Sequence, residues 1–193
     1  MTNRDLQKSL TRQRIIETAF VEFPKKGLLL TPTADLARVA GVAHGTIFTH
    51  FPTREDLLVA VIEEFGARIT RRLHELVIGG GALKEMLAAH LQGIKEFEPF
   101  YTRLITELQL LPKEARSTMV MIQSAISFHI IQSAEREIAL GKIRALPLHL
   151  LFNQWVGLIH YYLMNGAFFA PGESVLGRYD AELLGHYLEL IKK

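Results

Sequence analysis

Histidine and threonine side chains between residues 44 and 50 are the groups in this sequence best suited to contact nucleic acid. Imidazole and hydroxyl groups are short hydrogen-bonding groups that can reach base edges in a groove or oxygens of the phosphate backbone. Helical spacing presents four of them outward: His44, Thr46, Thr49 and His50. Because Gly45 has no side chain, the backbone beside it can approach a duplex closely. The pattern predicts a DNA-recognition helix.

The sequence on both sides of this segment predicts the helices that would hold it against DNA. Thr31 is a suitable N-cap and Pro32 fits the first helical position, so one helix is expected to start there and to end at Gly41. The recognition helix follows over 44–50, and Thr53 can cap a third helix. Apolar residues along the segment supply a shared core: Leu36, Val39, Val42, Ile47, Phe51 and Leu57. The arrangement is typical of a helix-turn-helix.

Positive charge is concentrated in the part of the chain that contains this pattern. Residues 1–54 carry eight Lys or Arg against four Asp or Glu, whereas the remainder carries fourteen against sixteen. Contact with phosphates requires such a bias. Thr33 and Arg54 lie near predicted helix N-termini, where donors and the helix dipole favour a phosphate. We therefore expect Thr33, Phe48 and Arg54 to support the recognition surface.

The segment resembles the N-terminal domain of the TetR family of one-component transcriptional repressors. The matching residues are 12–20, Phe23, Gly27, Thr31, 35–37, 40–42, 45–48, 50–51 and 54–57. So many matches at fixed spacing, over about a quarter of the chain, form a specific signal. The resemblance implies a DNA-binding helix-turn-helix domain over 1–53 and a ligand-binding and dimerisation domain over 54–193.

Four residues depart from the family pattern. Phe48 stands where the family usually has a tyrosine that reaches a phosphate, so that contact is lost or replaced. Ala43 occupies a position usually given to a capping serine. Ala34 is short where some relatives use a side chain for a base contact. Pro24 is expected to end the first helix slightly early, because proline removes a helical hydrogen bond.

The remaining sequence predicts helix after helix, with no strand alternation of useful length. Helices are expected over 54–77, 82–97, 98–110, 112–141, 147–169 and 178–191. With three helices before Arg54, the expected fold is all-α with nine helices. That total is also what the resemblance implies.

Composition and the distribution of polar residues indicate a folded protein outside the membrane. Nearly half of the residues are apolar, so a sizeable core is expected, and the absence of cysteine excludes disulfides and thiol chemistry. The polar N-terminus lacks a signal-peptide pattern, so we expect a cytoplasmic protein. The uncharged stretch 145–172 is long enough to span a bilayer. It contains polar residues that would be costly in hydrocarbon, so a buried helix is expected instead of a membrane span.

Eight histidines raise the question of an enzyme or a metal site. No histidine has a glutamate three positions before it, the spacing of helical di-iron sites. The motifs HExxH, GxSxG, GxGxxG and the P-loop are also absent. We therefore expect no catalytic residues, no metal and no cofactor, and the chain is predicted not to be an enzyme.

In the family that the sequence resembles, the C-terminal helices enclose a small-molecule pocket. Aromatic, soft and hydrogen-bonding side chains on the helices that would surround it are candidates: His90, Phe100, Tyr101, Met119, Gln123, Phe128, His129, Trp155 and Tyr161. His90 and His129 are the candidates to orient a polar ligand atom. Each of these residues has an alternative interpretation as an ordinary core residue. Because no charged residue is expected at the pocket centre, a mostly apolar effector is favoured.

The resemblance also implies a homodimer that binds palindromic double-stranded DNA through two recognition helices. The candidate interface lies on the last two long helices: Leu151, Trp155, Leu158, Tyr162, Leu184, Tyr187, Leu188 and Ile191. Two alternatives remain open. One is a DNA-bound adaptor whose C-terminal domain binds another protein, and the other is an all-α enzyme with a coincidental N-terminal motif.

Overall fold

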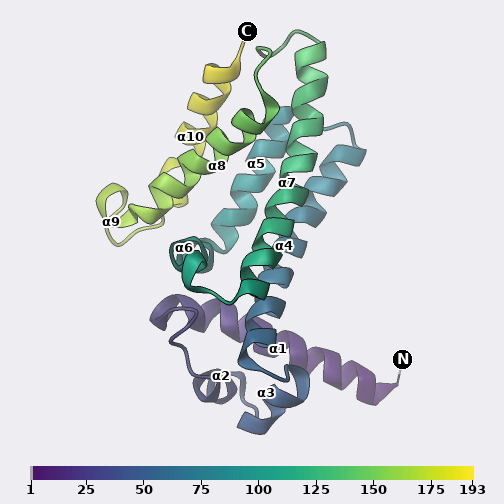
Figure 1. The fold of residues 1–193 in the computed structure, drawn as a ribbon, viewed down its shortest axis with the longest axis vertical. Helices are drawn as coiled ribbons and strands as arrows, with labels where there is room; N and C mark the ends of the chain where they lie inside the picture. The colour runs from purple at the N-terminus through teal and green to yellow at the C-terminus, as the bar shows by residue number, and fades with distance from the viewer. Residues whose placement is uncertain (1) are drawn as a thin grey trace. The chain divides into compact units, whose positions relative to one another are not determined.

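The computed structural model describes residues 2–193, apart from the side chain of Val77, and Met1 of the predicted first domain lies outside this range (Figure 1). The described residues form ten α-helices and one 3-10 turn: α1 Asn3–Lys26, α2 Thr33–Ala40, α3 His44–His50, α4 Arg54–Ile78, α5 Leu83–Glu96, α6 Glu98–Glu107, η1 Leu108–Leu110, α7 Lys113–Ala139, α8 Leu148–Met164, α9 Gly166–Phe169 and α10 Val175–Ile191. The prediction of an all-α fold is confirmed, while the predicted count of nine is one too low.

The additional helix arises because the predicted helix over 147–169 is interrupted at Asn165. The Asn165 side chain donates to the carbonyl of Tyr161 at 2.8 Å, and α8 ends at Met164. An Asn side chain that bonds to a nearby carbonyl competes with the helical ladder. The short helix α9 follows, so two helices replace the one expected.

The chain divides into two compact units: Met1–Phe65 with Pro99–Met119, and Gly66–Glu98 with Val120–Lys193. The helices α4 and α7 each contribute to both units. The division after residue 53 that the sequence favours stays a prediction. No helix among residues 2–193 is long and apolar enough to cross a membrane.

The first unit packs α1, α2, α3 and the first half of α4 around a common core. Its fully buried side chains include Ile15, Ile16, Leu36, Ile47 and Leu57. The helix α6 belongs to the same core, because the ring of Phe100 meets Phe20 edge-on with centroids 5.0 Å apart. Tyr101 stacks on Phe65 at 5.2 Å. The helix-turn-helix is thus supported by a helix that lies far away in the sequence.

The prediction that Pro24 ends the first helix early is wrong. Helix α1 continues through Pro24 to Lys26 and closes at Gly27, whose φ of 104° suits a residue without a side chain. The amide of Gly27 donates to the carbonyl of Phe23 at 2.8 Å. Proline in the last turn removes a single helical hydrogen bond, which the packed helix tolerates.

Capping differs from the prediction at one helix start and agrees with it at another. The Thr31 hydroxyl donates to the carbonyl of Gly27 at 2.7 Å, and α2 starts at Thr33 with Pro32 as its N-cap. The prediction that Thr31 caps this helix is therefore wrong. At α4, the Asp56 amide donates to the Thr53 hydroxyl at 3.0 Å, which confirms the predicted cap.

The second unit contains α5, α8 and α10, and its last helix begins earlier than the sequence indicated. Helix α10 starts at Val175 instead of Arg178, because the Ser174 hydroxyl caps it by accepting from the Gly177 amide at 2.7 Å. A carboxylate from another helix completes this cap. Buried Glu98 accepts from the amides of Val175 at 2.7 Å and Leu176 at 3.0 Å, near the positive end of the helix dipole.

Candidate nucleic-acid interface

The recognition helix α3 is held by a tight turn and a single buried residue. Gly41 adopts a left-handed conformation with φ 67°, and the amide of Val42 donates to the carbonyl of Ala37 at 3.0 Å. The predicted turn is confirmed. Within α3, Ile47 is the buried side chain, and the rest of the helix is exposed or half-buried. This arrangement leaves most of α3 available to a partner.

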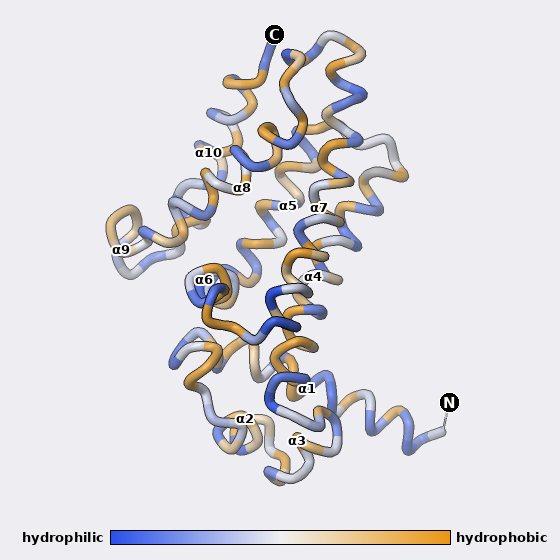
Figure 2. Tube along the Cα trace, in the orientation of Figure 1, coloured by the Kyte–Doolittle hydropathy of each residue, from blue (hydrophilic) through white to orange (hydrophobic). Residues whose placement is uncertain are grey.

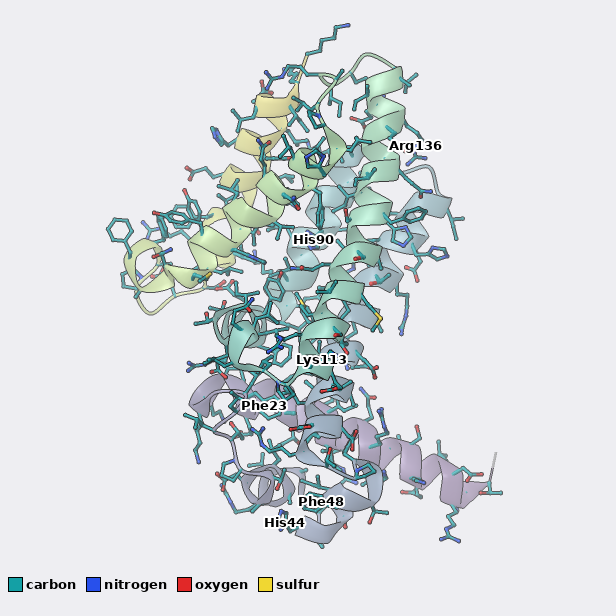
Figure 3. All side chains as sticks on the ribbon, in the orientation of Figure 1. Phe23, His44, Phe48, His90, Lys113 and Arg136 are labelled. Atoms are coloured by element: carbon teal, nitrogen blue, oxygen red, sulfur yellow. The ribbon has the colours of Figure 1, made fainter. Side chains whose placement is uncertain are left out.

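Three of the predicted site residues meet at the N-terminal ends of α2 and α3. The Thr33 hydroxyl lies 2.9 Å from Nε2 of His44, and the His44 ring meets the exposed Phe48 ring edge-on at 5.3 Å (Figure 3). Because Thr33 can donate to or accept from the imidazole, it restricts the orientation of His44. A base or phosphate would therefore meet an ordered imidazole on this face.

The other predicted residues of α3 differ in their exposure. Gly45 is exposed with open space beside it, and the exposed Thr49 hydroxyl donates to the Gly45 carbonyl at 3.2 Å. Thr46 is half-buried. His50 is half-buried as well, and its Nδ1 is enclosed without a hydrogen-bond partner among the described residues. Burial lowers the pKa of His50, and the nearby charges of Lys8 and Arg12 lower it further.

Arg54 contacts the backbone of the chain itself, and the phosphate contact expected of it stays a prediction. Its Nη2 donates to the carbonyl of Leu28 and lies 3.5 Å from the carbonyl of Thr31. Burial lowers the pKa of this guanidinium, whereas the neighbouring Glu107 and Glu55 carboxylates raise it. Arg54 thus supports the loop between α1 and α2 by contacting the backbone carbonyls of that loop. The sequence could place Arg54 at a helix start but could not show which way its side chain turns.

Helix α6 holds the same loop from a position that sequence reasoning missed. The Glu107 carboxylate accepts from the amide of Leu28 at 2.9 Å and from that of Leu29 at 3.4 Å. Arg103 lies 3.5 Å from Glu107 and donates to the carbonyl of Pro24 at 3.3 Å. No local sequence signal links α6 to this loop, because the partners are about eighty residues apart. The loop before α2 is therefore fixed by α4 and α6 together.

Removing the Glu107 carboxylate should destabilise the first unit. We expect Glu107→Ala to lower the free energy of unfolding by about 1–3 kcal/mol, because two backbone amides, one of them on fully buried Leu28, lose their acceptor. Urea titration followed by circular dichroism measures this change. Glu63→Ala, at an exposed position in the middle of α4, is the matched control and should change stability by less than about 0.5 kcal/mol. Equal effects of the two substitutions would contradict the proposed support of the loop.

The nine residues predicted to line a ligand pocket differ widely in their exposure and are divided between the two units. Phe100, Tyr101 and Met119 are buried in the core of the first unit. Phe128 and Tyr161, in the second unit, are largely exposed. The reason is that aromatic and soft side chains pack wherever apolar surface is available, so their residue types alone do not define a pocket.

Within the second unit, four other candidates have defined surroundings. His90 is buried, and its Nδ1 accepts from the indole N–H of Trp155 at 3.1 Å. His129 has an enclosed Nδ1 without a hydrogen-bond partner in the described part of the chain, and its ring lies 5.6 Å from that of His74. Gln123 lines an open hollow of about 440 Å³ between α7 and α8, together with exposed Phe128.

Half of the predicted dimer residues are buried within the protomer, so this part of the prediction needs correction. These four are Leu151, Trp155, Tyr187 and Ile191. The Tyr187 hydroxyl donates to the carbonyl of Leu151, which joins α10 to α8. The other four are half-buried: Leu158, Tyr162, Leu184 and Leu188. Because α8 is apolar on most sides, its sequence could not show which face the protomer itself covers.

Exposed apolar side chains form a separate stripe on α8 and α9. The stripe, called here the α8 face, consists of Leu150, Gly157, Tyr161, Met164 and Phe168. Phe168 is 80% exposed and Tyr161 is 60% exposed, values unusual for aromatic residues. A set of exposed apolar residues of this kind is a candidate interaction site. Among residues 2–193 there is no group of three or more potential metal-ligating side chains.

The helix-turn-helix with its supporting helices has the geometry of a DNA-binding domain, and comparisons with known proteins show which regulators it resembles. Residues 15–61 match the model of the bacterial regulatory proteins of the tetR family. The probable acrEF/envCD operon repressor of Escherichia coli K12 is 28% identical over 137 residues, which are 69% of this chain and 54% of that protein. The regulator TtgR of Pseudomonas putida is 42% identical over 53 residues, 28% of this chain and 25% of that protein.

Solved structures share the fold over nearly the whole chain. A TetR-family regulator from Agrobacterium tumefaciens superposes with a TM-score of 0.80 at 18% identity, covering 96% of this chain and 100% of that one. FadR from Bacillus subtilis, in complex with stearoyl-CoA, gives 0.75 at 20% identity, covering 93% and 98%. Residues 15–61 are therefore similar to the tetR family of bacterial regulatory proteins, and the chain as a whole has the fold of solved TetR-family structures. It spans about half the length of the Escherichia coli repressor that it matches. These relatives are all named as regulators of transcription.

Proposed function

We propose that this protein is a transcriptional repressor that binds a palindromic operator and leaves it when a small, mostly apolar effector binds. The observation that carries the proposal is the exposed face of α3, where Thr33 orients His44 beside Phe48. Short polar groups on an ordered helix suit contact with base edges in the major groove. A cytoplasmic location follows from DNA as the partner.

Substitutions on α3 test the DNA-binding part of the proposal. We expect His44→Ala and Thr46→Ala to change the preferred bases, because each removes a hydrogen-bonding group from the recognition face, at a cost of about 1–3 kcal/mol per lost base contact. The preference is measured by selecting bound sequences from a randomised duplex library based on the DNA that flanks the gene. His186→Ala, on exposed α10, is the matched control. If the His44→Ala and Thr46→Ala variants select the same bases as the unmodified protein and the control, α3 does not read the DNA sequence.

A homodimer would place two copies of α3 on one operator. Two-fold symmetry matches a palindrome when the recognition helices are about one turn of DNA apart, roughly 34–36 Å. We assign the interface to the α8 face together with half-buried Leu158, Tyr162, Leu184 and Leu188. The open space beside Gly157 and Gly185 would allow helices of the two protomers to approach closely.

The proposed effector acts by favouring a state in which the two copies of α3 are wrongly spaced for DNA. Helix α4 follows directly after the helix-turn-helix and continues into the second unit, so its movement can change this spacing. A preference of about ten-thousandfold, roughly 5.5 kcal/mol, would shift the population almost completely. Two proteins of the same fold support an apolar effector: one is described with stearoyl-CoA, and another, KstR2, as a ketosteroid regulator.

The effector is tested by asking whether compounds that stabilise the folded protein also lower its affinity for DNA. Fatty acyl compounds, steroids and other apolar metabolites are screened for a rise in melting temperature, because a ligand that binds only the folded state stabilises it by mass action. Each compound that stabilises the protein is then added to the protein–DNA complex, and we expect the affinity for DNA to fall. Stabilising compounds that leave DNA binding unchanged would contradict the coupling. A screen without any stabilising compound would favour the adaptor, whose second unit binds a protein.

A further inference from the structure

The N-terminal half of α1 carries a row of positive charges outside the helix-turn-helix. Arg4, Lys8 and Arg12 are spaced four residues apart, which places them along one side of the helix, and all three are exposed. At a rise of about 1.5 Å per residue, the row is roughly 12 Å long. This length is comparable with the width of the major groove of DNA, about 12 Å.

The row lies beside the C-terminal end of the recognition helix. The Arg12 guanidinium lies over the ring of Phe51, the residue directly after α3, at 5.0 Å from its centroid. The charges of both Lys8 and Arg12 lower the pKa of His50, the last residue of α3, in addition to the effect of its burial. From that contact, α1 extends past α3 to its free N-terminal end (Figure 1). The positive row thus continues the surface that α3 presents.

The charges of the row have little acidic charge around them in the part of the chain that the structure describes. Among residues 2–193, Arg4, Lys8 and Arg12 take part in no ion pair, although Lys8 is close enough to Asp5 to lower the pKa of that carboxyl. Asp5 is the only acidic residue among residues 2–16, and its carboxylate accepts from the Thr2 amide and hydroxyl at 3.0 and 2.7 Å. Figure 2 shows hydrophilic and hydrophobic residues alternating along this part of α1.

We propose that Arg4, Lys8 and Arg12 bind the phosphate backbone of DNA at the edge of the groove that α3 enters. The inference rests on the proposed function, since it assumes that α3 docks on a duplex. Long, flexible cationic side chains provide affinity for phosphates without reading sequence. The row therefore supplies affinity and fixes the orientation of the protein, while His44 and Thr46 supply the sequence preference.

The salt dependence of DNA binding tests the row without knowledge of the operator. The probe is a fluorescein-labelled duplex of random sequence, about 30 base pairs long, titrated with the full chain between about 50 and 200 mM salt. Arg4→Gln, Lys8→Gln and the double variant keep residues that favour helices, and circular dichroism checks their fold. Arg14→Gln is the matched control, because exposed Arg14 is turned well away from Lys8 and Arg12 around the helix axis, in line with Leu10.

We expect the slope of log affinity against log salt to fall by about one for each contact that is removed, and by about two for each bound protomer in the double variant. Arg14→Gln should leave the slope close to that of the unmodified protein. If the unmodified protein binds but the double variant shows the same slope as Arg14→Gln, the row does not contact phosphates and the inference is overturned. If the unmodified protein binds neither this probe nor the DNA flanking the gene, the proposed function itself fails.

Discussion

Lowering the pH from about 6.5 to 4 is expected to reduce the free energy of unfolding by several kcal/mol. Burial, reinforced by the charge of His160, lowers the pKa of His90 to about 3, and burial lowers that of His160 to about 4. An unfolded chain binds a proton at each of these histidines near pH 6.5, whereas the folded chain does not. Acid therefore favours the unfolded state, by about 1.4 kcal/mol per pH unit for each histidine. The stabilisation is complete above pH 6.5 and is lost as the pH falls towards 4.

Urea titrations at a series of pH values measure this effect, and the single tryptophan is a suitable reporter. Trp155 is buried and donates to His90, so its fluorescence should change when the second unit unfolds. His90→Gln keeps a side-chain oxygen that can accept from the indole, and it removes one titrating group. We expect this variant to lose about half of the histidine contribution to the pH dependence. His186→Gln, at an exposed position of α10, should retain all of it. Identical pH profiles for the two variants would show that His90 is not held neutral.

The helix-turn-helix could be predicted from sequence because its signals are local. The left-handed turn at Gly41 and the Thr53 cap of α4 each depend on residues within four positions of each other. Exposure on α3 follows from helical periodicity around Ile47. Such features need no knowledge of the remaining fold.

Contacts between distant residues could not be predicted in this way. The Glu107 carboxylate completes the loop before α2, and Glu98 caps α10, although each lies more than seventy residues from its partners. No local pattern joins either carboxylate to those amides. The direction of the Arg54 side chain depends on the same loop, so the sequence alone could not show it.

Which residues of α8 are buried could not be predicted from the sequence pattern either. The helix is apolar on most sides, so periodicity could not separate the residues that fill the protomer from those left for a partner. Trp155 and Leu151 prove to be core, whereas Tyr161 and Met164 are exposed. The proposed interface therefore uses a different side of the same helix.

A charge on the α8 face is expected to dissociate the proposed dimer and to weaken operator binding by about 10²–10⁴-fold. Tyr161→Asp places a carboxylate in the middle of this apolar stripe, where a partner would desolvate it. Two linked recognition helices bind one operator with a gain of this size over separate ones, and the gain is lost in a monomer. Tyr161 is preferred to half-buried Leu188, because a charge there would also disturb the protomer.

Light scattering gives the oligomeric state, and fluorescence anisotropy on the DNA flanking the gene gives the affinity. Leu140→Asp adds the same charge at an exposed apolar position just after α7, so it should remain dimeric and bind DNA as the unmodified protein does. Met164→Asp provides a second variant on the α8 face, where it should reproduce the effect of Tyr161→Asp. If both variants on the α8 face remain dimeric, the interface lies elsewhere. If they become monomeric but keep full operator affinity, one protomer binds the DNA by itself and the two-fold mode of recognition is wrong.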